Sequence, residues 1–117
     1  MDTERRDELI DAYFSALDEE EFSLVEPYLA PGVTYKSVGI EPLHGPDGVR
    51  RYFEELRPFG GTVHDVETRM HAANGSAAEG RVTGEHEGES IDTAFCDVFE
   101  FDDEEEHLTR IVVYTNA

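Results

Sequence analysis

The stretch Ser90–Phe101, with the sequence SIDTAFCDVFEF, is long, β-prone and alternating. Successive side chains of a strand point to opposite faces, so one face carries Asp97 together with Ile91, Thr93, Phe95, Phe99 and Phe101. An ionised, unpaired carboxylate is costly to bury among aromatic rings. Asp97 is therefore expected to be neutral, paired with a cation, or at the wall of a wet cavity, and its role can be structural or functional.

The length of 117 residues predicts a single domain, residues 1–117, whose core needs no disulfide or metal. The single cysteine suits a reducing compartment and is expected to serve as a small buried or interfacial hydrophobe. The N-terminal segment is charged, and no apolar run approaches the ~18 residues of a membrane span. These features predict a cytoplasmic protein without a membrane partner.

The chain is strongly acidic, with 28 Asp and Glu against 9 Lys and Arg and a formal net charge of −19 at pH 7. Because the acids are spread along the whole length, they indicate a solvated surface rather than an acidic tail. Their mutual repulsion would destabilise the folded state in dilute salt, so the composition predicts a halophilic, salt-adapted protein. Nucleic acid is excluded as a favoured partner because there is no basic patch.

Helical patterning dominates the first half of the chain. Apolar residues from Thr3 to Leu17 follow the spacing of an amphipathic helix, with Tyr13 facing the core. Phe22–Leu29 suggests a second, shorter helix that ends at Pro31-Gly32. A third helix is expected to begin at Pro46 and to stop at Arg57-Pro58.

Strands account for the rest of the prediction. A short strand, Val33–Val38, lies between the second and third helices, and Asn74-Gly75 is a strong hairpin signal. Four strands follow the helices, over Thr62–Ala73, Ser76–Glu87, Ser90–Phe101 and His107–Thr115. The small residues Ala78, Gly80 and Gly84 point inward and are expected to leave space.

The order of these elements predicts an α+β fold. Helices segregated to one face of a curled antiparallel sheet would enclose a cone-shaped cavity.

Three motifs carry a resemblance to a known superfamily. They are YFSAL at 13–17, HGPDGVRRYF at 44–53 and DVFEF at 97–101. With the predicted element order, they resemble the nuclear-transport-factor-2-like (cystatin-like) superfamily, in its SnoaL-like polyketide cyclase and ketosteroid isomerase branch. The resemblance covers nearly the whole chain. It implies a cavity that binds a small hydrophobic ligand, and a homodimer formed through the outer sheet face, where Ala94, Cys96 and Val98 lie.

The resemblance also implies catalytic groups. In ketosteroid isomerases a helix-1 tyrosine and a protonated aspartic acid hydrogen-bond the enolate oxygen, and these positions correspond to Tyr13 and Asp97. The position of the base falls on Ser37, which is not basic enough to remove a carbon-bound proton. If the protein is an enzyme, the resemblance implies an isomerase, cyclase or lyase that uses proton transfer without a cofactor.

Further polar candidates follow from the predicted strands. Arg110 shares the apolar register of the last strand, so it is expected either to pair with Asp97 or to bind a ligand carboxylate. His86 and His64 are placed near the cavity, where either can act as a base, bind a ligand or serve only the structure. His44 lies in the loop near Ser37 and can act from the cavity mouth.

The apolar wall of the binding site is assigned to Phe53, Phe95, Phe99 and Val82. The histidines stand alone without metal-ligand spacing, so no metal site is expected. Three functions stay open: a proton-transfer enzyme, a binding module without turnover, and a structural dimerisation domain. The last predicts a filled cavity and an ion pair between Asp97 and Arg110.

Overall fold

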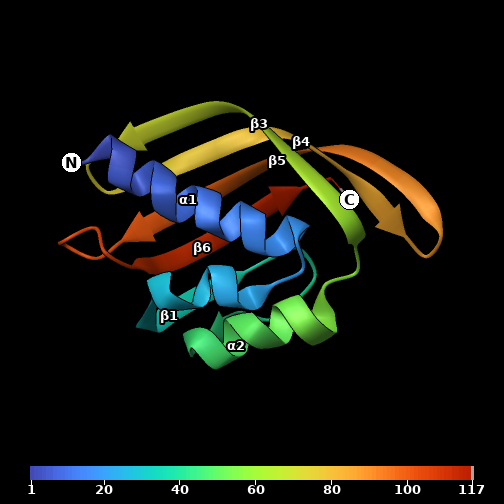
Figure 1. Ribbon diagram of the computed structural model, residues 1–117, viewed down its shortest axis with the longest axis horizontal. Coiled ribbons are helices and arrows are strands. Elements are labelled where there is room, and N and C mark those ends of the chain that lie inside the picture. The colour runs from blue at the N-terminus through green and yellow to red at the C-terminus, as the bar shows by residue number, and fades with distance from the viewer. Residues whose placement is uncertain (117) are drawn as a thin grey trace.

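A curled six-stranded sheet with the strand order β2-β1-β6-β5-β4-β3 forms the framework of the protein (Figure 1). The computed structural model describes residues 1–116. All neighbouring strands are antiparallel except β1 and β6, which are parallel. The strands are β1 (Leu29–Lys36), β2 (Leu43–His44), β3 (Gly60–Ala72), β4 (Gly75–His86), β5 (Glu89–Phe101) and β6 (Leu108–Thr115). The predicted α+β fold with a curled sheet is confirmed.

Helix α1 (Thr3–Asp18) lies across one face of the sheet (Figure 1). It begins after Asp2, whose side chain accepts a hydrogen bond of 3.1 Å from the backbone N–H of Arg5, as an N-cap residue does. The face predicted to be apolar is buried, with Leu9 and Ile10 fully covered and Tyr13 1% exposed. The helix therefore places the Tyr13 side chain between itself and the sheet.

The predicted second helix is wrong in type. Two short 3-10 turns stand in its place, η1 (Phe22–Leu24) and η2 (Glu26–Tyr28). Pro27 has no N–H to donate and fits only the first positions of such a turn. Strand β1 then begins at Leu29 and contains Pro31, which the sequence had suggested as a stop, because a register shift between Leu29 and Thr34 accommodates it.

The third helix is confirmed, but it has two parts. Helix α2 (Gly45–Arg51) continues into a π-helical segment, η3 (Tyr52–Leu56), and the chain becomes extended at Arg57. Val49 and Tyr52 are its buried residues. The loop that follows, with Pro58 and Phe59, leads directly into β3.

The small residues of β4 do not leave empty space, which corrects the prediction. A Cβ atom at Gly80 would lie 1.9 Å from the carbonyl oxygen of Asp65, and one at Gly84 would lie 2.9 Å from that of Gly60. The backbone of β3 therefore approaches these glycines closely, helped by register shifts in β3. This close approach of β3 and β4 accompanies the curl of the sheet over α1 (Figure 1).

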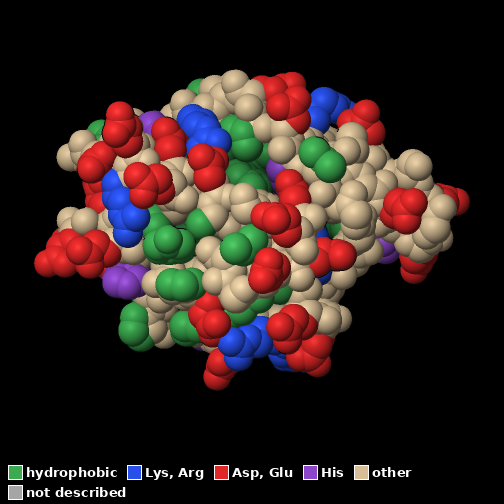
Figure 2. Space-filling view, in the orientation of Figure 1, with side chains coloured by type: hydrophobic (Ala, Val, Ile, Leu, Met, Phe, Trp, Pro, Cys, Tyr) green, Lys and Arg blue, Asp and Glu red, His purple; other side chains and the backbone are tan. Residues whose placement is uncertain are grey.

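Acidic side chains are distributed over the visible face of the molecule, with few basic ones between them (Figure 2). Within residues 1–116, no helix is long and apolar enough to cross a membrane.

Candidate functional site

A small cavity lies between α1, β1, the Arg57–Phe59 loop and the inner face of the sheet. Its volume is about 40 Å³, measured as the space open to the centre of a water molecule. A single water needs roughly 10–15 Å³ by that measure, so the cavity has room for a few waters at most. Its polar lining residues are Tyr13, Tyr35, Ser37, Tyr52, Arg57, His64, Asp97 and Thr115. The predicted catalytic residues Tyr13 and Asp97 therefore line one cavity.

Asp97 is the unusual group in this lining. Its side chain is 2% exposed, and its Oδ1 atom is buried with no hydrogen-bond partner. Burial raises the pKa of this carboxyl to about 8, against a small opposing effect of the Tyr114 backbone N–H. At neutral pH the carboxyl is therefore mostly protonated, which gives the cavity wall an O–H donor.

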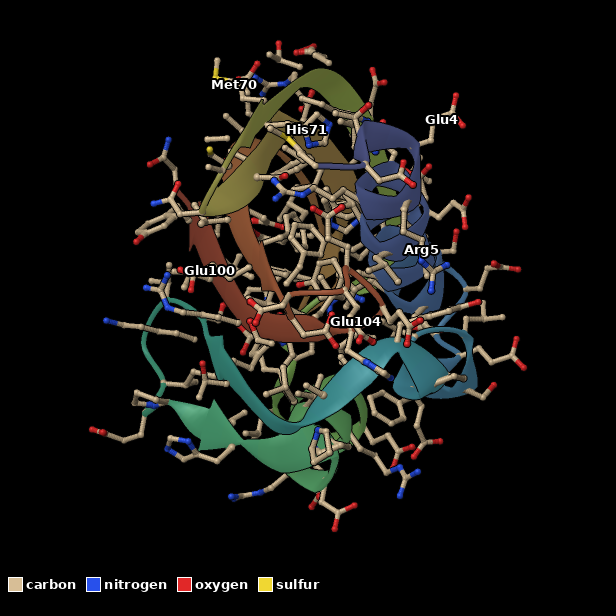
Figure 3. All side chains as sticks on the ribbon, turned by 90° about the vertical axis from the view of Figure 1, so that its left-hand side faces the viewer. Glu4, Arg5, Met70, His71, Glu100 and Glu104 are labelled. Atoms are coloured by element: carbon tan, nitrogen blue, oxygen red, sulfur yellow. The ribbon has the colours of Figure 1, made fainter. Side chains whose placement is uncertain are left out.

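Arg110 does not pair with Asp97, and the prediction that it faces the cavity is wrong. Glu100 stands opposite Arg110, whereas Phe101 stands opposite Leu108, so β6 has one extra residue at this point. This β-bulge puts Leu108 inside the core and turns Arg110 to the outer face. There its Nη1 lies 2.5 Å from Oε2 of Glu100. Figure 3 shows Glu100 on the side of the sheet away from α1.

A second tyrosine, which the sequence analysis did not single out, joins the site. The hydroxyl of Tyr35 on β1 lies 2.7 Å from that of Tyr13, and both side chains are 1% exposed. Burial is the main cause that raises the pKa of both tyrosines. The second cause is the negative charge of Asp97 for Tyr13, and that of Tyr13 for Tyr35. The pair stays neutral, and since one hydroxyl donates to the other, one O–H is left for a third group.

His64 belongs to a hydrogen-bonded network at the other side of the cavity. Its Nδ1 lies 2.5 Å from Oδ1 of Asp18, at the end of α1, and its backbone N–H donates to Oδ2 over 2.9 Å. The Thr62 hydroxyl donates to Asp18 over 3.0 Å and accepts from Arg57 over 2.8 Å. Burial alone would raise the pKa of Asp18, but the hydrogen bonds from His64 and Thr62 outweigh it and lower the pKa.

The other two histidine candidates lie elsewhere. His86 is at the end of β4 with 42% of its side chain exposed, and its Nδ1 is 3.0 Å from the carbonyl oxygen of Pro58. His44 is exposed on the two-residue strand β2. Neither lines the cavity, so the expectation that they act in it is not met.

The four apolar candidates lie in or behind the cavity wall. Val82 and Phe95 line the cavity directly. Phe99 is fully buried, with its ring centroid 5.5 Å from that of Tyr13, and Phe53 packs 6.1 Å from the same ring. The aromatic residues thus fix the position of Tyr13. In the described part of the chain, no group of three or more His, Cys, Asp and Glu residues could hold a metal ion.

Comparison with known proteins gives one family and many structures. A family model described as a SnoaL-like domain matches residues 10–111. A search of curated proteins gives no match.

Similar solved structures include an epoxide hydrolase of Mycobacterium tuberculosis described as LEH-like (18% identity, 96% of this chain and 83% of that chain, TM-score 0.78). A putative SnoaL-like polyketide cyclase of Shewanella denitrificans has 15% identity over 95% of this chain and 90% of that chain, with a TM-score of 0.77. A protein of Catenulispora acidiphila with a ketosteroid isomerase-like fold, in complex with trimethylamine, has 14% identity over 92% and 84%, with a TM-score of 0.80. At these identities the likeness shows the fold.

Proposed function

The chain belongs to the SnoaL-like domain family, and on this premise we propose that its cavity binds a small, largely apolar molecule with a carbonyl or similar acceptor oxygen. Neutral Asp97 and the pair of Tyr13 and Tyr35 would donate hydrogen bonds to that oxygen. Bound in this way, the carbonyl is polarised toward an enolate. The reaction class that suits these groups is a cofactor-free isomerisation, cyclisation or elimination.

The observation that carries the proposal is the unpartnered Oδ1 atom of Asp97. A buried polar atom without a hydrogen bond is rare in folded proteins and costs about 1–3 kcal/mol. Here the atom belongs to a residue that lines a cavity, so a ligand oxygen can supply the missing partner. An Asp97 with a purely structural role would have a partner within the core, as Arg6 and Ser76 have.

Each donor would contribute to catalysis by stabilising developing negative charge. A preorganised donor of this kind typically contributes about 3 kcal/mol to the stability of the transition state. Two donors are available, the Asp97 O–H and the tyrosine hydroxyl that is not used within the pair. A low-dielectric environment of aromatic rings would strengthen both hydrogen bonds.

A ligand larger than a few waters must enlarge the cavity. Two neighbouring hollows, of about 90 Å³ and 120 Å³, share the Phe59 side chain with it. Phe59 lies in the loop between η3 and β3 rather than in a helix or strand. Movement of this one ring would connect the three spaces, and we propose it as the entrance.

A second candidate function is ligand binding without turnover. Ser37 supports it, because Ser37 lines the cavity where ketosteroid isomerases carry their base, and a serine there cannot remove a proton from carbon. Binding would use the same donors, so the two candidates differ only in whether another residue acts as a base.

The experiment that tests the proposal is binding of 2-naphthol, an apolar molecule whose oxygen mimics an enol, followed by its fluorescence. We expect binding near pH 6.5 and a Kd about 10-fold to 100-fold weaker in Asp97→Leu, since a hydrogen bond to a charged or strongly polar group contributes about 1.5–3 kcal/mol. Arg110→Ala is the control and should bind as the wild type does. Equal affinity in Asp97→Leu and wild type would contradict the proposal.

A further inference from the structure

We propose that His64, oriented by Asp18, is the proton acceptor of this cavity, and that its reaction removes a proton from a carbon next to the ligand's carbonyl group. The inference rests on the proposed function, because it needs a carbonyl bound by Asp97. His64 would be the base that is absent at position 37, where this chain has a serine.

The hydrogen bonding of His64 leaves one ring nitrogen available. Nδ1 is occupied by Asp18 at 2.5 Å, whereas Nε2 has no hydrogen-bond partner within residues 1–116. His64 lines the cavity, and its side chain is 7% exposed. With the proton held on Nδ1 by the carboxylate, the Nε2 lone pair is the basic site.

The Asp18 carboxylate is itself fixed in place. It accepts hydrogen bonds from the Thr62 hydroxyl and from the backbone N–H of His64, and Arg57 in turn donates to Thr62. These contacts keep Asp18 ionised, so it can stabilise the imidazolium that forms when His64 accepts a proton. Asp18 is a positioning residue, because it acts through His64 and does not line the cavity.

Packing fixes the imidazole ring in one orientation. The ring centroid of His64 is 4.9 Å from that of Phe14 on α1 and 5.2 Å from that of Phe95 on β5. A base held between two rings needs little reorganisation before proton transfer. Among the described residues that line the cavity, no other has an imidazole.

His64 and Asp97 are separated along the sheet, as a base and an oxygen-binding group must be. His64 stands opposite Val82 on β4, whereas Asp97 stands opposite Ala78. These backbone positions are four residues, or about 13 Å, apart along the sheet, and both side chains line the one cavity between them. We place the carbonyl oxygen of the ligand at Asp97 and the neighbouring carbon toward Nε2 of His64, once Phe59 has moved.

The proposed step balances without a co-reactant. The C–H bond next to the carbonyl breaks, its proton goes to Nε2 of His64, and its electron pair forms the C=C bond of an enolate. The carbonyl oxygen takes the negative charge and is stabilised by the Asp97 O–H and a tyrosine O–H. The imidazolium then returns the proton to the same carbon or to a conjugated one, which makes the reaction an exchange or an isomerisation.

Two other histidines lie beside a carboxylate outside the cavity. Nδ1 of His107 lies 2.8 Å from Asp102, and Nε2 of His71 lies 3.2 Å from Asp7. His107 is in the turn before β6 with 37% of its side chain exposed, so its substitution should not disturb the core. It is the matched control for a His–Asp pair without access to the cavity.

The test measures exchange of the α-protons of cyclohexanone for deuterium in D2O by NMR, with the wild-type protein and His64→Gln, Asp18→Asn and His107→Gln. General base catalysis typically contributes 10²–10⁴-fold, so we expect wild type and His107→Gln to accelerate exchange and His64→Gln to lose at least about 100-fold. The wild-type rate should fall in acid, where an imidazole is protonated. It should fall again at alkaline pH, where Asp97 ionises and no longer donates a hydrogen bond to the carbonyl oxygen, whereas the pKa of Asp18 is lowered and the pKa values of Tyr13 and Tyr35 are raised, so these groups keep their charge states across the neutral range. Asp18→Asn should displace the acid limb of this profile, which a purely structural contact would not do.

Naphthol binding in the same variants separates the two proposals. If naphthol binding depends on Asp97 but wild type does not accelerate exchange, or His64→Gln exchanges at the wild-type rate, the role of His64 is overturned and the binding function stands. If naphthol binding does not depend on Asp97, the proposed function itself fails. Should His64→Gln not fold, a wild-type profile without an acid limb would still overturn the role of His64.

Discussion

The Nη1 atom of Arg110 lies 2.5 Å from the Oε2 atom of Glu100, on the outer face of the sheet. The pair is half exposed, so it contributes little to stability, typically under about 1 kcal/mol. This pairing matters for Asp97, which lies three residues before Glu100 and faces the inner side of the sheet. With this guanidinium held outside, Asp97 forms no ion pair among residues 1–116, and its carboxyl stays mostly protonated near neutral pH.

Asp97→Asn should stabilise the protein increasingly as the pH rises. In the folded wild type the pKa of Asp97 is about 8, above its ordinary value of 3.8, so between these values the unfolded chain is ionised first and the free energy of unfolding falls with pH. One pKa unit corresponds to about 1.4 kcal/mol, so the variant should gain several kcal/mol over wild type between pH 4 and pH 8. Urea unfolding of both proteins at fixed salt measures the difference. A difference that does not change with pH would contradict the assigned pKa.

Gly80→Ala should destabilise the protein by more than about 3 kcal/mol or prevent folding, since overpacking against backbone cannot be relieved by a side-chain rotation. The new Cβ would lie 1.9 Å from the carbonyl oxygen of Asp65. Gly32→Ala is the matched control, because a Cβ at Gly32 meets nothing within 4 Å, and its stability should be close to that of wild type. Thermal unfolding compares the two, and equal melting temperatures would show that β3 does not approach Gly80 this closely.

Arg6→Lys should destabilise the protein by about 2–4 kcal/mol, because the buried guanidinium makes several hydrogen bonds that a single ammonium cannot reproduce. Arg6 is 4% exposed, lies 3.3 Å from Glu105, and donates to Ala72, Gly75 and Ser76. These bonds join the start of α1 to the turn between β3 and β4. Denaturant unfolding measures the loss.

Arg5→Lys is the control for this prediction. Arg5, labelled in Figure 3, is the preceding residue of α1, and its ion pair with Glu8 is partly exposed. Its substitution should change the free energy of unfolding by less than about 0.5 kcal/mol. Similar losses in both variants would mean that the contacts of Arg6 with the hairpin are not important for stability.

Potassium chloride should raise the melting temperature of the wild type. The formal net charge of −19 repels itself, and the Debye length falls from about 10 Å at 0.1 M salt to about 3 Å at 1 M. The rise should shrink at pH 4, where many of the acidic groups are protonated. A melting temperature that is independent of salt at pH 7 would argue against salt adaptation.

Phe59→Ala should increase the association rate of 2-naphthol, because it removes a ring that lines the cavity and both neighbouring hollows. Stopped-flow fluorescence measures this rate. Met70→Ala is the control, since Met70 is 64% exposed on the outer side of β3 and projects away from the molecule (Figure 3). Identical rates in Phe59→Ala and wild type would mean that the ligand enters elsewhere.

Some of the site could be predicted from the sequence because it depends on local geometry. Alternation along β5 put Phe95, Asp97 and Phe99 on one buried face, and all three are buried in the structure. The helical spacing of α1 directed Tyr13 to the core in the same way. Residues that repeat with the period of their own strand or helix reveal which face they occupy, whatever they pack against.

The tertiary structure alone decided which of these residues meet and which ions pair. Tyr13 reaches Tyr35 across 22 positions and Asp18 reaches His64 across 46, and no spacing in the sequence relates them. A single extra residue in β6 turned Arg110 from the inner face, where the sequence placed it, to the outer face. The backbone of β3 occupies the space that the sequence predicted beside Gly80. A strand's period fixes the face of a side chain, but bulges, curvature and long-range contacts depend on the packing of the whole sheet against α1. Asp97 is therefore neutral for two reasons. The alternation of β5, which the sequence determines, buries its carboxyl, and the bulge in β6, which only the fold shows, keeps Arg110 on the other face of the sheet.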